Sequence, residues 1–423
     1  MSSIRKSLLQ IMFLGASMRR WNDKLRPIEL YEVDKQGHKM IIAWMLTLLN
    51  SRHASESEKI ALQQTVIERG LFDYLFGLIV TDITPQIFHR ICEHHIHKRQ
   101  LTDWVLNKLK PIVEPLSRDF WDRMVKYHYQ TDRTELADKI IKAARLYASG
   151  WEFALIQPFN TFDEETKNIS HFFISELFAL KELTGVQDLI QGEAFFIENP
   201  TALGHFARLS GQLRFQIRWS DTPRVPETSV LGHMFLVAGY VYFCSLVIGC
   251  CPARCVNNFF AGLFHDLPEL LTRDIITPVK RSVDQFSILL KEYELQELER
   301  RIFVPLRKSG YIDLVHRLQY YLGLLGEDVT SEFQETIQDS SGVKRIKNFE
   351  ELQLFNNKDE FDPKDGQLLK ACDSLAAFLE AHTSIYKGIS SPVLHAAVAR
   401  IHADFHNLTF GTLSFGTLLA DFD

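Results

Sequence analysis

The chain has 423 residues, a length that suggests two or three domains. Of these residues, 46% are hydrophobic and 24% are charged, a balance typical of a globular protein. The formal net charge is −6 and no long basic segment occurs, which excludes a protein that binds nucleic acid through a broad positive surface. The six cysteines form no CxxC pair; we interpret them as reduced, buried thiols of a cytoplasmic protein, with a disulfide or a metal cluster as the alternative.

Two apolar segments resemble membrane signals. Residues 1–15 place two cations before an apolar run, as a signal peptide does, but the run is short and Gln10 interrupts it. Residues 234–251 carry no charge over 18 positions, which is long enough to cross a bilayer. We interpret this second segment as a helix buried on all sides of a helical core, because His233 begins it and a His-Asp pair follows. No membrane contact is therefore expected.

Helical periodicity dominates the rest of the chain. Residues 101–129 and 286–325 place apolar side chains three and four positions apart, whereas alternating strand patterns are hard to find. The sequence therefore predicts an all-α protein. Residues 327–366 are polar and are predicted to form an irregular loop that could act as a lid or a partner surface.

Four histidines lie close together at residues 89–97, in the sequence FHRICEHHIHK. Their spacing follows no recognised ligand motif, and the segment is rich in charge. We interpret His89, His94, His95 and His97 as part of a solvated helix face rather than a metal cluster.

An internal repeat divides the chain. Four motifs occur twice in the same order, with offsets of about 192 to 228 residues, so the sequence predicts two copies of one fold at residues 1–198 and 199–423. The pairs are MRRWND at Met18 with QIRWSD at Gln216, GHKM at Gly37 with GHMF at Gly232, GLFDYLFGLIVTDITP at Gly70 with GLFHDLPELLTRDIITP at Gly262, and IIKAARLYASGWEF at Ile140 with LLKACDSLAAFLEA at Leu368.

Three ionisable residues lie within one helical turn of the second copy. His265, Asp266 and Glu269 share one helix face, although their segment is otherwise apolar. Such groups are costly to bury unless they are paired or bind a metal, so a metal site competes here with a salt-bridged or solvated helix face. His233 and Asp373 also lie in apolar segments. Two imidazoles and two carboxylates suit Mn²⁺, Fe²⁺, Co²⁺, Ni²⁺ or Mg²⁺, and the lack of thiolates disfavours a structural zinc site.

The same residues carry a resemblance to a known family. The pattern of His233, the His265-Asp266 pair and Asp373 resembles the HD-domain metal-dependent phosphohydrolases. The Arg-Trp pair 15 residues before His233, together with HDLPELLTRDIITPVK, is most similar to the bacterial 5′-deoxynucleotidase branch of that superfamily. The match covers roughly residues 218–280 plus Asp373. In place of the carboxylate that this branch usually has before the first histidine, the chain has Gly232.

The resemblance implies a role for each matching residue. Glu269 would be the general acid or base, and Asp266 would belong to the catalytic centre as well as to the metal. Arg218 would neutralise the phosphate, Trp219 would pack on the nucleoside, and Asp274 would accept hydrogen bonds from the sugar. Trp219 as a core aromatic and Asp274 as a turn residue before Thr277-Pro278 remain alternatives. The implied ligands of one divalent metal are His233, His265, Asp266 and Asp373.

The function implied by the resemblance is removal of the 5′-phosphate of deoxyribonucleoside or ribonucleoside monophosphates. The expected partner is a small nucleotide, with no nucleic acid. Because of Gly232 and the long polar segment, two alternatives stay open: hydrolysis of another phosphorylated substrate, such as a nucleoside triphosphate or a cyclic nucleotide, and a non-catalytic nucleotide sensor. The two copies are expected to form a pseudo-dimer within one chain, either as a monomer or in a homo-oligomer.

The first copy is predicted to be a degenerate HD-like domain that has lost its metal. It would either pack against the active copy or bind a regulatory nucleotide. In the alignment of the two copies it keeps Arg20, Trp21, His38 and Asp82, but has Asp73 for His265, Tyr74 for Asp266, Gly77 for Glu269 and Arg145 for Asp373.

Overall fold

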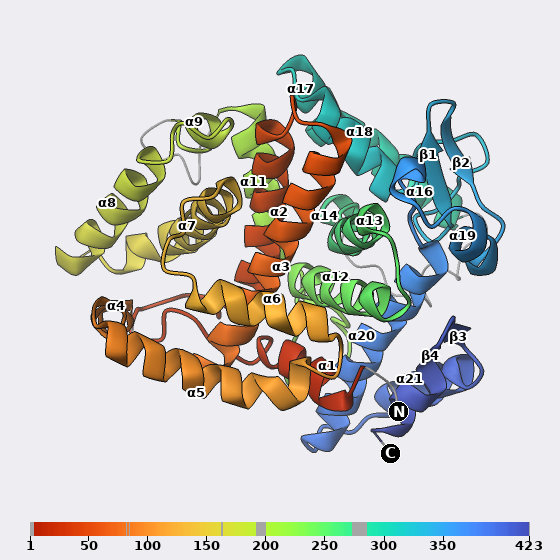
Figure 1. The fold of residues 1–423 in the computed structure, drawn as a ribbon, viewed down its shortest axis with the longest axis horizontal. Helices are drawn as coiled ribbons and strands as arrows, with labels where there is room; N and C mark the ends of the chain where they lie inside the picture. Colours follow the sequence, from red (N-terminus) through yellow and green to blue (C-terminus); the bar gives the residue numbers. More distant parts are fainter. Residues whose placement is uncertain are drawn as a thin grey trace.

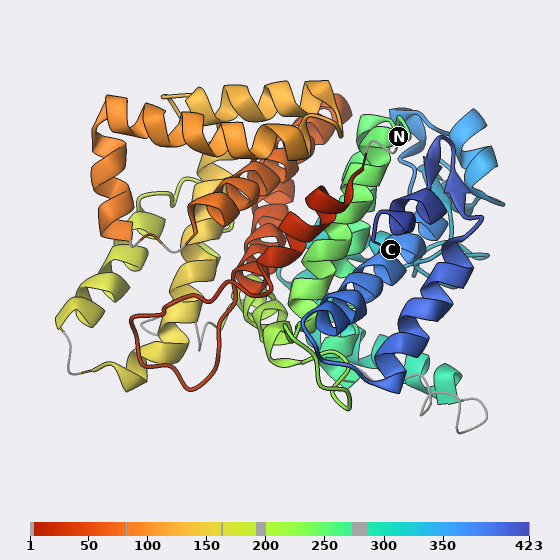
Figure 2. The ribbon, with the colours of Figure 1, turned by 90° about the horizontal axis from the view of Figure 1, so that it is seen from below.

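The computed structural model describes residues 4–81, 83, 85–161, 164–191, 200–272 and 286–422. In these ranges, helices form nearly all of the regular structure, and the strands are short (Figures 1 and 2). The prediction of an all-α fold is therefore confirmed.

The described helices fall into two sequence halves, which we define as residues 1–198 and 199–423. Those of the first half are α1 (Lys6–Leu14), α2 (Glu32–Asn50), α3 (Glu56–Val80), α4 (Pro85–Glu93), α5 (His95–Val113), α6 (Arg118–Tyr129), α7 (Leu136–Ile156), α8 (Glu164–Phe178) and α9 (Val186–Leu189). Those of the second half are α11 (Ala202–Gln212), α12 (Val230–Val247), α13 (Pro252–Phe264), α14 (Glu269–Thr272), α16 (Phe286–Leu298), α17 (Val304–Lys308), α18 (Ile312–Tyr321), α19 (Phe349–Phe355), α20 (Gly366–Tyr386), α21 (Pro392–Phe405) and α22 (Phe415–Ala420).

Helix α12 is the central element of the fold. It begins after Ser229, whose hydroxyl accepts a 2.9 Å hydrogen bond from the Gly232 amide and so caps the helix. Helices α2, α13 and α20 pack around it, and Figure 1 places it near the middle of the molecule. It is the one described helix long and apolar enough to cross a membrane, but 89% of that stretch is buried inside the protein. The interpretation of this segment as a core helix is confirmed.

The N-terminal ends of α2 and α12 meet at close range. A Cβ atom on Gly232 would lie 2.7 Å from Oδ1 of Asp34, so a larger residue at this position would require the Asp34 side chain to move. Ser229 donates a 2.6 Å hydrogen bond to the same carboxylate oxygen. Buried side chains from both halves belong to one continuous hydrophobic cluster. The predicted boundary at residue 198 lies outside the described residues, so the division into two domains stays a prediction.

The polar segment at 327–366 is ordered, and its prediction as an irregular loop is wrong. Strand β1 (Thr336–Asp339) pairs antiparallel with β2 (Gly342–Arg345), with Asp339 opposite Gly342, and α19 follows. A second small hairpin joins β3 (Thr409–Phe410) to β4 (Leu413–Ser414). Short hairpins of this kind were missed because so few residues show no alternating pattern.

A buried ion pair fixes the end of this polar segment to the helical core. The guanidinium of Arg254 on α13 donates to both carboxylate oxygens of Asp365, at 2.7 and 2.6 Å, and both side chains are fully buried. Asn258 donates to the same carboxylate at 2.6 Å. Because Asp365 is the N-cap residue of α20, this pair also sets where α20 begins relative to α13.

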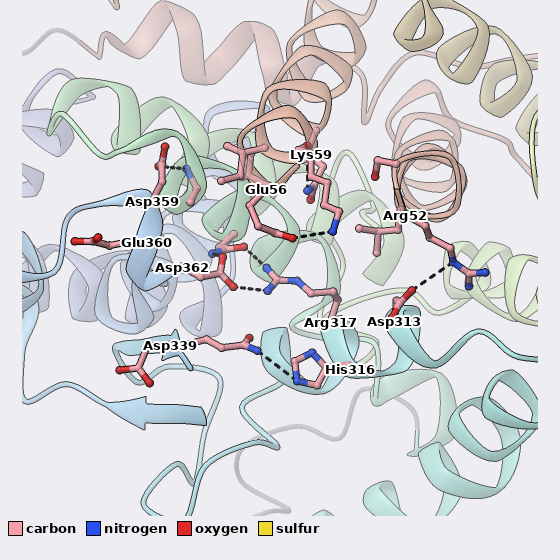
Figure 3. A pocket seen from close by; sticks show the side chains of 18 of the residues that line it. Arg52, Glu56, Lys59, Asp313, His316, Arg317, Asp339, Asp359, Glu360 and Asp362 are labelled. Carbon is pink, nitrogen blue, oxygen red and sulfur yellow. Dashed lines mark hydrogen bonds and ion pairs between the residues drawn. The ribbon is translucent and has the colours of Figure 1, made fainter. Parts of the chain in front are cut away.

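A polar groove with a volume of about 740 Å³ lies between the two sequence halves (Figure 3). Ion pairs line it: Arg317 Nη1 lies 2.5 Å from Asp362 Oδ2, Lys59 Nζ lies 2.7 Å from Glu56 Oε1, and Arg52 Nε lies 3.3 Å from Asp313 Oδ2. The last pair joins the end of α2 to α18. Of these three pairs, only the last crosses from one half to the other.

The Arg254–Asp365 pair predicts a large stability cost. Replacing Asp365 with Ala leaves the Arg254 charge buried without a counter-ion, which should lower the free energy of unfolding by about 3–5 kcal/mol. Chemical denaturation measures this loss. The control is Glu360→Ala in the same segment: Glu360 makes an exposed pair with Lys358 and its loss should change stability little. Equal, small effects of both variants would contradict the prediction.

Candidate metal centre

Two histidines from consecutive helices bring their rings together. His233 lies in the first turn of α12, and His265 follows the last residue of α13, with 5.4 Å between the ring centroids. The close packing of the two helices makes this possible, because a Cβ on Gly262 would lie 2.8 Å from the Ala238 Cα. His265 Nδ1 lies 2.8 Å from the Gly262 carbonyl oxygen, which leaves Nε2 directed toward His233 and the neighbouring carboxylates.

Two carboxylates complete this group. Asp266 Oδ2 lies 3.2 Å from His265 Nε2 and 3.7 Å from His233 Nε2. Asp373, from α20, places Oδ1 3.1 Å from His233 Nε2 and 4.0 Å from His265 Nε2. The structure thus brings together all four residues that the sequence predicted as metal ligands, on three different helical segments. The donor atoms of His233, His265 and Asp266 lie within 4.8 Å of one another.

The chemistry of this group fits a divalent cation. The buried Nε2 of His265 has no hydrogen-bond partner among the described residues. Burial acts to raise the pKa of Asp266, but the nearby charge of His265 outweighs it and holds that pKa well below its usual range. Burial likewise acts to lower the pKa of His265, and Asp266 raises it to about 9. The site therefore attracts positive charge, which a proton on His265 supplies when no metal is bound.

Arg218 and Glu269 lie beside the four ligands. Arg218 Nη1 is 3.3 Å from Asp266 Oδ2, and its side chain is only 13% exposed. Burial acts to lower the Arg218 pKa, but the carboxylates of Glu380, Asp266, Asp373 and Glu269 raise it well above its ordinary value. Glu269 opens α14, where its amide donates a 3.0 Å hydrogen bond to the Asp266 carbonyl oxygen.

Trp219 is half-buried at the edge of the site. Its ring packs on the cluster of Ala381, Leu394 and Ala397 between α20 and α21. Its backbone has φ of 55°, a conformation that side-chain-bearing residues rarely adopt. The ring is thus partly packed in the core, and the Arg224 guanidinium lies 5.7 Å from its centroid. Asp274, the predicted sugar-binding residue, lies outside the described residues.

Glu380 is a residue of the site that sequence reasoning missed. It is fully buried on α20, and its Oε1 lies 3.4 Å from His233 Nδ1 and 3.5 Å from Arg218 Nε. Its Oε2 accepts a 2.8 Å hydrogen bond from Trp219 Nε1. A carboxylate facing Nδ1 favours a proton there and leaves Nε2 free for a metal. The available signal was a glutamate in an apolar helix, two turns after Asp373 and therefore on the same face.

The histidines at residues 94–97 form no such group. His94, His95 and His97 are exposed, which agrees with a solvated helix face; nothing is described for the His89 side chain. Within the described ranges, the group of His233, His265 and Asp266 is the one set of potential ligands whose donor atoms lie close enough to share a metal. All six cysteines are free thiols.

The contacts around Glu380 have a counterpart in the first half. Glu152 on α7 accepts hydrogen bonds from Arg20 Nε at 2.7 Å and from Trp21 Nε1 at 3.2 Å. Trp21 has φ of 56°, nearly the value of Trp219. The two Arg-Trp turns therefore adopt the same backbone conformation, and each is held by a buried glutamate from a later helix.

The backbone bonds around the two turns also correspond. Arg20 N donates to Leu30 O and Glu32 N donates to Met18 O, whereas Arg218 N donates to Thr228 O and Val230 N donates to Gln216 O. These residue numbers differ by 198 throughout.

At this spacing Lys35, and not His38, corresponds to His233, so the alignment of GHKM with GHMF is wrong by three residues. His38 is fully buried with Nε2 2.9 Å from the Ala207 carbonyl oxygen, and burial lowers its pKa to about 3. It is a core histidine on the next turn of α2. The short GH motif misled the alignment because it occurs on both helices by chance.

Replacing Glu380 with Gln should weaken metal binding by about 10- to 100-fold, because the side chain no longer fixes the His233 ring with a negative charge. Calorimetric titration of the metal-free protein with Mn²⁺ measures the change. The matched control is Glu152→Gln, which removes the same charge beside the other Arg-Trp turn and should leave Mn²⁺ affinity unchanged. If both variants lower the affinity equally, the effect is one of folding and the positioning role of Glu380 is wrong.

Comparison with known proteins agrees with this geometry. A protein-family model described as HD domain matches residues 210–402, just under half of the chain. No curated protein and no solved structure matches the chain. The matched range contains His233, the His265-Asp266 pair and Asp373, in the order that gives the family its name. Residues 210–402 therefore resemble an HD domain, and proteins with this domain are typically metal-dependent hydrolases.

Proposed function

We propose that the protein is a metal-dependent phosphomonoesterase that removes the 5′-phosphate of nucleoside monophosphates, with deoxyribonucleotides as the expected substrates. The observation that carries this proposal is the convergence of two imidazoles, two carboxylates and one guanidinium at a single point. Arg218 contacts Asp266 directly, so a phosphate oxygen held by the guanidinium would lie beside the candidate metal ligands. The HD domain supports metal-dependent hydrolysis in general.

The proposed metal ligands are His233, His265, Asp266 and Asp373, which provide two nitrogen and two oxygen donors. A divalent metal bound there would supply a water of lowered pKa and would polarise the phosphoryl group. Mn²⁺, Fe²⁺, Co²⁺, Ni²⁺ and Mg²⁺ all accept such a donor set. Lys370 Nζ, 2.7 Å from Asp373 Oδ2, holds this carboxylate from the solvent side.

The remaining steps belong to the side chains around the ligands. Arg218 would bind and orient the phosphate, with its own position fixed by Glu380. Attack of water forms one P–O bond and breaks the bond to the 5′ oxygen. The proton lost by the water must reach the departing 5′ oxygen, and Glu269 is the group proposed to transfer it. The half-buried Trp219 is the residue proposed to pack against the nucleoside.

The space next to His233 bears on substrate choice. In the similar 5′-deoxynucleotidases a carboxylate usually precedes this histidine, whereas Gly232 occupies the position here. The Asp34 carboxylate of the first half fills the space that a side chain on Gly232 would need. The contact between α2 and α12 therefore explains why Gly232 replaces the usual carboxylate. For this reason we retain the nucleotidase proposal.

Released phosphate from a panel of nucleoside mono-, di- and triphosphates, with Mn²⁺, Co²⁺ or Mg²⁺, tests the reaction. We expect phosphate from monophosphates, none after chelation, and a loss on the order of 10³-fold in Asp266→Ala, because a metal contributes several kcal/mol to the transition state. Asp119→Ala, on the surface of α6, is the control. Turnover of triphosphates or cyclic nucleotides alone would replace this substrate, and metal binding without any turnover would indicate a sensor.

Glu269→Gln separates proton transfer from metal binding. Turnover of the best monophosphate should fall by about 10²- to 10⁴-fold, because an amide cannot transfer the proton. The Mn²⁺ stoichiometry should stay at the wild-type value, as the residue is not among the four ligands. Undiminished turnover would show that another group carries the proton.

A further inference from the structure

The first half repeats the arrangement that surrounds the metal centre, an Arg-Trp turn held by a buried glutamate, which we call the frame. The charged residues that this frame presents differ between the two halves. Helix packing supports the alignment in the other two regions: a Cβ on Gly70 would meet Met40, as one on Gly262 would meet Ala238. The shared role of Glu152 and Glu380 aligns α7 with α20. Position by position, Lys35 corresponds to His233, Asp73 to His265, Tyr74 to Asp266, Gly77 to Glu269 and Arg145 to Asp373.

These differences make the first half far more positive at this point. Lys35 adds one positive charge, Arg145 in place of a carboxylate adds two, and the loss of the Asp266 and Glu269 carboxylates adds two more. Glu32, at the position of Val230, and Asp73 each subtract one. Counted with both histidines of the second half neutral, these positions make the first half three charges more positive; a proton on His265 reduces the difference to two, which equals the charge of a divalent metal.

The cations of the first half converge from two helices. Glu32 bridges two of them, with Oε2 2.6 Å from Arg20 Nη1 and Oε1 3.2 Å from Lys35 Nζ. Arg20 also donates to Ser149 at 3.3 Å and to Glu152 at 2.7 Å on α7.

Arg145 lies on the same face of α7, because residues 145, 149 and 152 are one and two turns apart. Arg145 therefore lies one turn before Ser149, a residue to which Arg20 donates.

Access to this group differs from residue to residue. Lys35 is buried, with a side chain only 8% exposed, and Arg20 is 20% exposed. Arg145 is exposed and makes no hydrogen bond or ion pair within the part of the chain that the structure describes. The group therefore ends in an uncommitted guanidinium at the surface, with further cations behind it. An anion with several acceptor oxygens satisfies such an arrangement better than a single carboxylate does.

We propose that the first half binds the phosphate group of a nucleoside monophosphate without a metal, through Arg145, Lys35 and Arg20, as a second and non-hydrolytic site. The nucleotide as ligand class rests on the proposed function, whereas the phosphate follows from the charges themselves. Hydrolysis is not expected there, since Tyr74 and Gly77 stand in place of a metal ligand and the proton-transfer group. Trp21 keeps the place beside the guanidinium that Trp219 has in the second half.

Calorimetric titration of the full chain in the presence of a chelator tests this site. The protein is Asp266→Ala, so that the metal centre is disabled, and the two probes are inorganic phosphate and 2′-deoxyadenosine 5′-monophosphate. One molecule should bind per chain. Arg145→Ala, at an exposed position, should weaken binding by about 10- to 100-fold, because charge-assisted hydrogen bonds are lost. If phosphate binds and the nucleotide does not, the site is a general anion site, and the nucleotide is wrong as the ligand class.

Two controls locate the binding. Arg118→Ala removes an exposed arginine on α6 and should change nothing, whereas Arg218→Ala should also leave chelator-resistant binding intact. Sensitivity to Arg218→Ala but not to Arg145→Ala would assign the binding to the second half and overturn the inference. If neither probe binds, but the wild-type protein still releases phosphate in the presence of Mn²⁺, only the inference of a second site is overturned. The cations would then merely replace the charge of the metal, and the proposed function would be unaffected.

Discussion

A single buried carboxylate organises the site. Glu380 is fully buried, yet it faces His233, Arg218 and Trp219 and accepts a hydrogen bond from Thr228 at 2.8 Å. Its pKa stays below the usual range, because the nearby cations outweigh the effect of burial. A buried charge of this kind is tolerated only when it is surrounded by partners, so the Arg-Trp turn, the start of α12 and the middle of α20 are held in one arrangement. The positions of the metal ligands follow from that arrangement.

The first half builds the same frame around Glu152, although a lysine and an arginine take the positions of two metal ligands. The frame and the metal chemistry are therefore separable. Arg20, Trp21 and Glu152 need no metal to satisfy one another, and Arg214 adds a further buried partner to Glu152 at 2.7 Å. We propose on this basis that the halves are two copies of one fold. In the second half the frame presents imidazoles and carboxylates, which suit a cation, whereas in the first half Lys35 and Arg145 take two of these positions, which we propose suits an anion.

The two halves contact each other at the start of α12. Asp34, one residue before Lys35, accepts a hydrogen bond from Ser229, which caps the helix that carries His233. Lys35 therefore follows directly in the chain on the residue that contacts the start of α12. Arg254 and Asp365 fix the opposite side of the centre by joining α13 to the beginning of α20. The ligands are thus held between a buried ion pair on one side and the contact between the two halves on the other.

The sequence by itself determined the all-α class, the buried helix α12 and the four metal-ligand candidates, because helical periodicity, apolar length and the HD spacing are local patterns. It failed where a decision depended on packing. The hairpin of β1 and β2 is too short to show a pattern, and the match of His38 with His233 rested on two letters, whereas the hydrogen bonds of the Arg-Trp turns select Lys35. Glu380 looks like any helical glutamate until α20 folds against α12. Only the tertiary structure decides which buried charges meet, since partners distant in the chain determine whether a charge can be buried at all.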